Sequence, residues 1–243
     1  MSWLDRSGLF TRRNCRVPNL RGWAVLIGTG LGFGFFVLYR IDPFLSLSHP
    51  IPAEVLVVES WLPDYALFNA VGEFKRGGYK YVVATGPSLP PAGDLSRYPT
   101  AAEFAAAKLA QLGLPPERIV AVPSGSPAQD RTYSSGTALK RWLEIKDNSL
   151  KALNVYTLGT HARRSRLLFQ KVLGNKVKVG VIACPDCYYD SQRWWATSEG
   201  VRTVTSEGLA YLYARFVFPL LPHKDTDPTD PKQHITGLEP GAR

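Results

Sequence analysis

Asn154–Phe169, NVYTLGTHARRSRLLF, is the stretch that decides the fold. Residues Asn154–Leu158 are predicted to form a buried strand, which a glycine-containing tight turn follows. A helix is then predicted to begin at Thr160. A strand that turns directly into a helix is the building unit of a parallel sheet covered by helices.

Four basic side chains crowd the first turns of this predicted helix, namely His161, Arg163, Arg164 and Arg166. A helix N-terminus carries a partial positive charge and unsatisfied N–H groups, so cations are disfavoured there. A phosphate at the turn would satisfy the N–H groups, the helix dipole and the arginines together. The pattern therefore indicates an anion site, and the alternative is that the arginines form a solvated face paired with surface carboxylates.

The chain has 243 residues and a net charge of +9. That length suits one membrane segment and one globular domain of ~150–180 residues. Basic charge is compatible with nucleic acid, anionic lipid or an anionic substrate. We expect no nucleic acid partner, because zinc-finger spacing, a basic-region helix and an aromatic–basic strand signature are all missing from the sequence.

Residues 22–39 form an uncharged, mostly apolar run of 18 residues between Arg21 and Arg40. That length is just enough to span the hydrocarbon core as a helix. Five arginines lie in residues 1–21, so the positive-inside rule predicts a cytoplasmic N-terminus and an extracytoplasmic main domain. The prediction is a single-pass anchor in the cytoplasmic (inner) membrane, with the domain in the periplasm.

Two alternatives concern this segment. A cleaved signal peptide is disfavoured, since the apolar run is long and no A-x-A-like site follows it. The Gly28/Gly32 and Gly30/Gly34 pairs are two overlapping GxxxG patterns, which are compatible with a homodimer formed through the helix.

The rest of the chain alternates between strands and helices. We expect a Pro-rich linker at 40–53, an α/β domain at 54–218 and a disordered tail at 219–243, which has little apolar content. Strands are predicted at 54–59, 80–84, 118–122, 152–158 and 176–183. The predicted fold is Rossmann-like, a three-layer α/β/α arrangement around a mainly parallel five-stranded sheet.

Two of the helices carry signals at their ends, and a third shows apolar periodicity. Asp64 is predicted to cap a helix that ends at Gly77-Gly78, and Thr100-x-x-Glu103 is a capping-box pattern. In the last helix, at 203–218, the apolar spacing of Leu209, Leu212, Tyr213 and Phe216 predicts the buried face.

Cys184 and Cys187 form a single C-P-D-C motif. One CxxC without a second pair is poor support for zinc. A disulfide is the first interpretation for an exported domain, free thiols the second and a redox dithiol the third.

Ligands of open α/β sheets bind outside the carboxyl ends of the strands, where the strand order switches. This rule selects the loops at 59–64, 85–98, 124–132, 160–164 and 184–190. It is in these loops that the chain becomes similar to known proteins.

Residues 53–218 resemble the YdcF/SanA/ElyC-like family of domains of unknown function. The matching pieces are EVLVVE, KYVVATG, an acidic residue early in the next helix (Glu103), AQDRTYSSG and LGTHARRSRLLF. The most specific are Asp130-Arg131-Thr132-Tyr133 and His161-x-x-Arg164. The resemblance implies a Rossmann-like fold and a role in biogenesis or barrier maintenance of the bacterial cell envelope. It supplies no settled reaction.

One loop departs from the family pattern. Where members usually have a Gly-rich turn after the first strand, this chain has Glu59-Ser60-Trp61-Leu62-Pro63. Without glycine the backbone approaches a phosphate less closely. A phosphate site would therefore depend on Thr160–Arg164 and Asp130–Thr132.

The loops offer carboxylates facing a His/Arg group, a combination that suits hydrolysis or transfer at a phosphate or pyrophosphate linkage, with the anchor indicating a lipid-linked substrate. A neutral His161 is expected at the helix N-terminus. The candidate catalytic residues are Glu103, Asp130 and His161. The candidate ligand- or anion-binding residues are Glu59, Asp64, Thr85, Gly86, Arg131, Thr132, Thr160, Arg163 and Arg164.

Three questions stay open at this point. Asp130, Thr132 and Glu103 are also explained as helix caps, and His161 as a structural residue. No short ligand spacing supports a metal, although a divalent ion remains compatible with the carboxylates. The two hypotheses are an anchored enzyme acting on an anionic envelope precursor and a catalytically inert anchored module that binds such a ligand or a protein partner.

Overall fold

The computed structural model describes residues 18–89, 97–125, 130–146 and 149–220. The chain divides into two compact units, Met1–Tyr39 and Arg40–Arg243. Most of the predicted cytoplasmic segment and most of the predicted tail lie outside the described residues.

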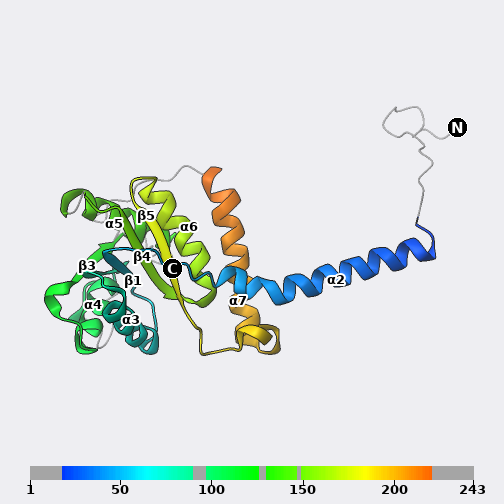
Figure 1. Ribbon diagram of the computed structural model, residues 1–243, viewed down its shortest axis with the longest axis horizontal. Coiled ribbons are helices and arrows are strands. Elements are labelled where there is room, and N and C mark those ends of the chain that lie inside the picture. Colours follow the sequence, from blue (N-terminus) through cyan, green and yellow to red (C-terminus); the bar gives the residue numbers. More distant parts are fainter. Residues whose placement is uncertain (1–17, 90–96, 126–129, 147–148, 221–243) are drawn as a thin grey trace, which may run out of the picture. The chain divides into compact units, whose positions relative to one another are not determined.

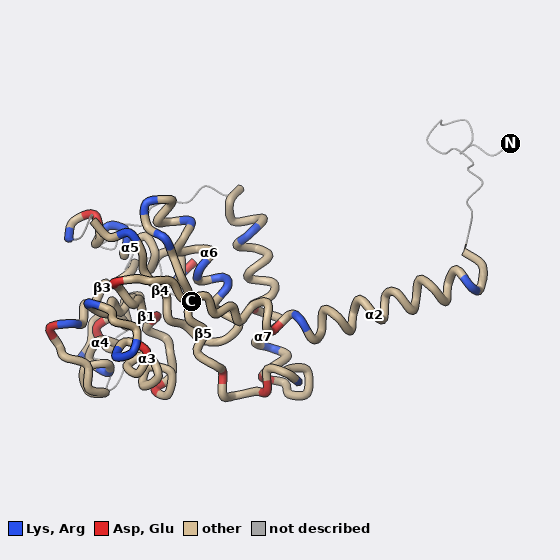
Figure 2. Tube along the Cα trace, in the orientation of Figure 1, with Lys and Arg blue, Asp and Glu red and all other residues tan. Residues whose placement is uncertain are grey.

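The first described element is the helix α2, Leu20–Leu45, which has 26 residues. By length and composition it can cross a membrane. Figure 2 shows that its charged residues are confined to its two ends. The apolar run predicted as an anchor therefore lies within one helix.

The segment 40–53 was predicted as a linker, and the structure corrects this. Helix α2 continues to Leu45, and Asp42 and Leu45 are both buried in the second unit. His49 exchanges two backbone hydrogen bonds with Val181, of 2.7 and 3.1 Å. Pro50 and Pro52 are tolerated because the backbone groups that bond to the domain belong to His49 and Ile51, whereas Pro43 lies in the last turn of α2.

Five parallel strands form one sheet in the order β3-β2-β1-β4-β5 (Figure 1). This confirms the predicted fold class. The order reverses between β1 and β4, so that ligands are expected where these two strands end. The strands are β1 (Val55–Glu59), β2 (Tyr81–Pro87), β3 (Ile119–Ser124), β4 (Ala152–Leu158) and β5 (Lys178–Cys184).

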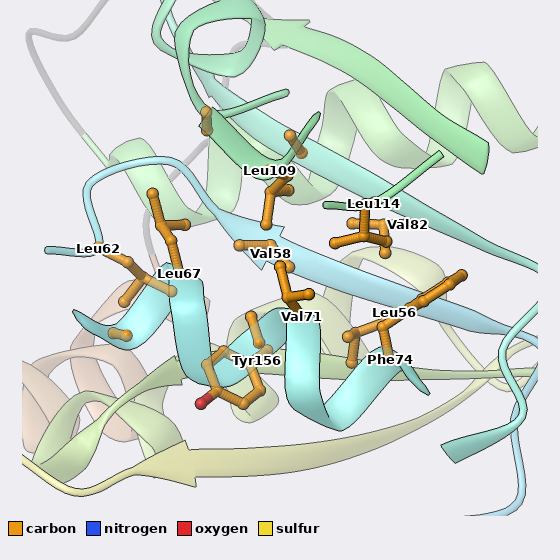
Figure 3. Close-up of a cluster of buried hydrophobic side chains, with 14 of the residues drawn as sticks. Leu56, Val58, Leu62, Leu67, Val71, Phe74, Val82, Leu109, Leu114 and Tyr156 are labelled. Atoms are coloured by element: carbon orange, nitrogen blue, oxygen red, sulfur yellow. The ribbon is translucent and has the colours of Figure 1, made fainter. Parts of the chain in front are cut away.

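Two helices cover each face of the sheet (Figure 1). Because successive side chains of a strand point to opposite faces, Leu56 and Val58 of β1 face one pair of helices, while Val55 and Val57 face the other. Figure 3 shows the first of these two cores. The helices are α3 (Asp64–Gly77) and α4 (Ala101–Gln111) on one face, and α5 (Arg131–Lys146) and α6 (Ala162–Leu173) on the other.

The last helix buries a different face from the one predicted. Helix α7 spans Ser198–Leu212 and continues as a π-helical turn, Tyr213–Val217, and a 3₁₀ turn, Phe218–Leu220. Its buried side carries Val204, Ala214 and Phe218, whereas the four apolar residues predicted as the core face are exposed. The sequence of this helix contains two apolar stripes, and only one of them can face the domain.

Asn154 in β4 holds the segment before β1 against the sheet. Its side chain is buried and makes three hydrogen bonds, two with the backbone of Ile51 (3.0 and 2.8 Å) and one with the Tyr79 hydroxyl (2.9 Å). Buried polar groups that lose such partners are costly to leave unpaired.

We expect Asn154→Leu to lower the free energy of unfolding by about 2–4 kcal/mol, because it removes both hydrogen bonds to the backbone of Ile51 and leaves the Tyr79 hydroxyl with Glu73 alone. Urea unfolding of the full chain in nanodiscs, followed by tryptophan fluorescence, measures this. Lys151→Ala, at an exposed position just before β4, is the control. An Asn154→Leu protein as stable as this control would contradict the assignment.

Candidate functional site

A cavity of about 730 Å³ lies at the carboxyl ends of β1 and β2, beside the starts of α5 and α6 and the inner side of α7. One part of its lining is made of polar side chains and another part of apolar side chains. The polar lining includes Glu59, Thr85, Asp130, Arg131, Thr132, His161, Arg164 and Glu207. The apolar lining includes Trp61, Leu89, Phe104, Leu168, Ala210, Ala214 and Phe218.

His161 lies between two carboxylates. Its Nδ1 is 3.0 Å from Glu207 Oε1, and its Nε2 is 3.7 Å from Glu59 Oε1 and 3.4 Å from Thr132 Oγ1. Glu59 ends β1, His161 follows β4 and Glu207 lies on α7. The imidazole therefore joins the two strands at the switch point to the last helix.

Two further side chains complete this group. Arg164 binds Glu207 through Nε (2.9 Å) and Nη2 (3.0 Å), and Ser165 Oγ donates to Glu59 Oε2 (3.0 Å). Glu59, Ser165, His161, Arg164 and Glu207 are hereafter called the histidine cluster. Its two carboxylates can be balanced by two cations, one of which is the imidazolium form of His161.

The surroundings shift the pKa values of all three titratable members. Burial alone would lower the pKa of His161, and Arg164 acts in the same direction, but Glu59 and Glu207 outweigh both and raise it. Burial alone would raise the pKa of Glu59, and His161 reverses this and lowers it. Burial opposes ionisation of Glu207 too, yet His161 and Arg164 lower its pKa to about 2. The helix start alone favours a neutral His161, whereas the two carboxylates favour the imidazolium; Arg164 Nη2 also lies 2.8 Å from Nδ1, a contact in which a neutral ring can accept a hydrogen bond.

The arginines at the start of α6 do not converge on an anion. Arg163 donates to the backbone oxygen of Phe44 and stacks over its ring, with 3.9 Å between guanidinium carbon and ring centroid. Arg166 donates to the Val179 carbonyl (3.0 Å). Only Arg164 lines the cavity, and Glu207 already engages it. Partners within the protein therefore explain the local excess of positive charge.

The start of α5 retains the features of an anion site. Arg131 is exposed, lines the cavity and has no ion-pair partner among the described residues. Thr132 lies beside it in the first turn, where N–H groups lack helical partners. The preceding residue, Asp130, has a φ of +49°, a left-handed conformation that non-glycine residues rarely adopt. Such backbone conformations cluster at functional sites.

The end of β2 adds a hydroxyl that has no partner among the described residues. Thr85 is buried, its Oγ1 makes no hydrogen bond there, and it lines the cavity. A buried polar atom without a partner indicates a ligand or water contact. Gly86 lines the cavity as well, and a Cβ at this position would lie 1.9 Å from Ser60 Oγ, so close packing of the β1 and β2 loops requires glycine.

The loop after β1, residues 60–63, supplies an aromatic wall. Trp61 lines the cavity, and its ring stands edge-on to that of His161, with 4.8 Å between centroids and 67° between planes. This placement covers one side of the histidine cluster with apolar surface. The sequence alone gave no reason to expect such a contact.

Besides Arg163, three predicted site residues lie outside the cavity. Glu103 closes the capping box of α4, accepting hydrogen bonds from Thr100 N (3.1 Å) and Oγ1 (2.9 Å), and it does not line the cavity. Asp64 forms an exposed ion pair with Lys108 (3.0 Å). Thr160 is buried and is not among the residues that line the cavity.

Sequence reasoning missed Glu207 and Ser165. A signal for Glu207 does exist, because Val204, Glu207, Tyr211, Ala214 and Phe218 follow one another at spacings of three and four residues. A carboxylate on such an otherwise apolar helical stripe predicts a buried, paired charge. Ser165 has no comparable signal.

Cys184 and Cys187 are free thiols in the structure, the first buried and the second exposed. Cys184 Sγ lies 3.7 Å from Asn69 Nδ2, whereas the backbone of Cys187 lies beside Tyr65. Within the described part of the chain, no group of three His, Cys, Asp or Glu side chains is arranged to hold a metal ion.

Comparison with protein-family models and with curated proteins finds no match to this chain. The resemblance to the YdcF/SanA/ElyC-like family therefore stays a prediction.

The histidine cluster should make stability depend on pH at both ends of the range. The raised pKa of His161 contributes stability that is complete below about pH 6.5 and is lost as pH rises through the raised value. Glu207, with its pKa lowered from 4.5 to about 2, contributes stability that is present above about pH 4.5 and is lost as pH falls toward 2.

Glu207→Gln should reduce both dependences, because it removes one titrating group and one of the two carboxylates that favour the imidazolium. Urea unfolding of the full chain in nanodiscs between pH 3 and 9 would measure the effect. Glu144→Gln, at an exposed position on α5, is the control and should follow the parent. A Glu207→Gln profile identical to that of the parent would show that the cluster is not coupled to folding.

Proposed function

We propose that this chain is a membrane-anchored enzyme that hydrolyses or transfers a phosphate- or pyrophosphate-linked group of a lipid-linked cell-envelope precursor. The observation that carries the proposal is the position of His161 between Glu59 and Glu207, at the polar part of a cavity that also has an extended apolar lining. A polar site beside an apolar lining suits an amphiphilic substrate.

The substrate's phosphate has binding partners that the histidine cluster does not use. Arg131 can bind phosphate oxygens with its guanidinium, the first-turn N–H groups of α5 favour an anion, and the Thr85 hydroxyl can donate a hydrogen bond. All three line the same cavity as His161. The residues that would bind the anion are therefore different from those of the histidine cluster.

His161 supplies the acid–base chemistry. A water molecule or an acceptor hydroxyl forms the new bond to phosphorus, and the bond to the leaving oxygen breaks. Protonated His161 gives the Nε2 proton to that leaving oxygen, and the proton released by the attacking group restores the imidazolium. Glu59 and Glu207 favour the protonated ring and fix its orientation, with Glu207 at Nδ1.

The apolar lining accommodates the lipid part. The loop after β2 contributes Leu89, and the helix α4 contributes Phe104. Helix α6 contributes Leu168, and the turns that follow α7 contribute Ala214 and Phe218. Hydrocarbon packed against these side chains leaves water, which favours binding by about 25 cal/mol per Å².

The proposed location follows from the charge distribution around α2. The arginines before the apolar run favour a cytoplasmic N-terminus by the positive-inside rule, so the α/β domain would face the extracytoplasmic side. The resemblance to envelope-associated proteins agrees with this location.

One observation favours a second candidate, an anchored binding module without catalysis. With His161 protonated, the histidine cluster contains two negative and two positive charges, and each of its members has a partner within the protein. A cluster of this kind can be purely structural. The two candidates differ in whether removal of the imidazole abolishes turnover or only changes stability.

The test uses the full chain in phosphatidylglycerol-containing nanodiscs with a polyprenyl pyrophosphate, and measures release of inorganic phosphate. His161→Asn should lower kcat by about 10²–10⁴-fold in the protein that stays folded, with little change in substrate binding, because the proton donor is lost. Thr85→Val should raise the dissociation constant of the substrate without destabilising the fold. His49→Asn, at an exposed histidine, is the control.

Full turnover by His161→Asn would contradict the catalytic role. Binding of the probe by the parent without turnover would favour the binding module. Absence of both binding and turnover would overturn the proposed substrate class.

A further inference from the structure

An apolar stripe runs along the outer side of the last helix, on the side opposite the cavity. It consists of Leu209 (65% exposed), Leu212 (51%), Phe216 (62%) and Leu220 (81%), with Val217 at one edge and Tyr213, which also reaches the cavity, at the other. Large apolar side chains that are contiguous and exposed mark an interaction surface. We call these six residues the α7 stripe.

The composition of this segment differs from that of the helix start. The first half of α7 exposes Arg202, Thr205 and Ser206, whereas Gly208–Leu220 contains a single charged residue, Arg215. In Figure 2 the second half is accordingly almost free of charged residues. Tyrosines and an arginine beside leucine and phenylalanine are typical of helices that lie at a membrane surface.

The chain connection keeps this stripe near the proposed anchor. The ring of Phe44 packs edge-on against that of Tyr211, at 5.5 Å between centroids, and Leu45 is buried beside Val204. Phe44 is only five positions after Tyr39, where the apolar run ends, and five residue steps reach at most about 18 Å even when fully extended. This limit holds for any orientation of the domain.

We propose that the α7 stripe docks on the phospholipid surface of the bilayer that α2 crosses. The leucines and Phe216 enter the boundary between headgroups and acyl chains, to a depth of about 5–10 Å. Arg215, which lies 5.6 Å from the Phe216 ring, is exposed and extends its guanidinium to lipid phosphates. No carboxylate in Gly208–Leu220 opposes anionic headgroups.

Docking would link the membrane to the cavity through one helix. Ala210, Ala214 and Phe218 line the cavity from the inner side of the same segment that carries the stripe. Docking would hold the apolar lining of the cavity next to the bilayer, which is the source of the lipid-linked substrate. This docking rests on the proposed function, because it requires the membrane anchor.

Two other occupants are weaker candidates. Residues 221–243 of this chain contain only three aliphatic side chains larger than alanine or proline, Leu221, Ile235 and Leu238. Six acidic or proline residues interrupt the sequence between the first two, namely Pro222, Asp225, Asp227, Pro228, Asp230 and Pro231. A second copy of the chain would have to pair two stripes that each carry Arg215, which brings like charges together.

The experiment places the photo-crosslinking residue benzoylphenylalanine at Phe216 of the full chain, in vesicles of phosphatidylethanolamine and phosphatidylglycerol. Thr205, exposed on the polar half of the same helix, is the matched control site. We expect a chain–phospholipid adduct at Phe216, detected by mass spectrometry, and at least about tenfold less at Thr205, as interfacial burial of one helix face requires.

Equal lipid adducts at both sites, an adduct with a second copy, an adduct with residues 221–243, or no adduct would each overturn the docking. Alkaline carbonate extraction of the same vesicles distinguishes the two levels of failure. A chain that is extracted has no anchor, which contradicts the proposed function as well, whereas a chain that stays in the membrane without a lipid adduct contradicts only the docking.

Discussion

The interaction of His161 with Glu59 and Glu207 is the constraint on which the rest of this site depends. It joins the end of β1, the turn after β4 and the last helix, which come from three distant parts of the chain. A buried carboxylate is costly without a partner, so loss of the imidazole would leave Glu59 without a cationic neighbour, whereas Glu207 would keep Arg164. By holding α7 against the sheet, the same contact forms one wall of the cavity and fixes which side of α7 faces outward.

Charge balance within the histidine cluster changes where an anion can bind. Arg164 already pairs with Glu207, and Arg163 and Arg166 bond to backbone oxygens, so the cationic start of α6 is used for structure. The remaining polar groups of the cavity belong to the start of α5 and the end of β2. A phosphate bound there would lie in the same cavity as the proton donor without competing for its carboxylates.

The fold was largely predictable from local sequence. Short apolar runs gave all five strands, Thr100 and Glu103 gave the start of α4, and strand order places Glu59 and His161 at the switch point as expected. The partners of charged residues were less predictable, since Glu207 lies 46 residues after His161 and pairing at that separation leaves no local pattern. The outer face of α7 was misassigned because hydrophobic spacing cannot tell a face buried in the domain from one that contacts something else.

The protonation state of His161 is the central claim, and ¹⁵N NMR of imidazole-labelled full chain in nanodiscs tests it most directly. Assignment by His161→Asn separates its signal from those of the other three histidines. We predict that His161 is an imidazolium at pH 7, with protons on both ring nitrogens and a pKa above the ordinary value of about 6.5 that falls in Glu207→Gln. A neutral ring at pH 7, with an unprotonated Nδ1 accepting a hydrogen bond from Arg164, would contradict the account.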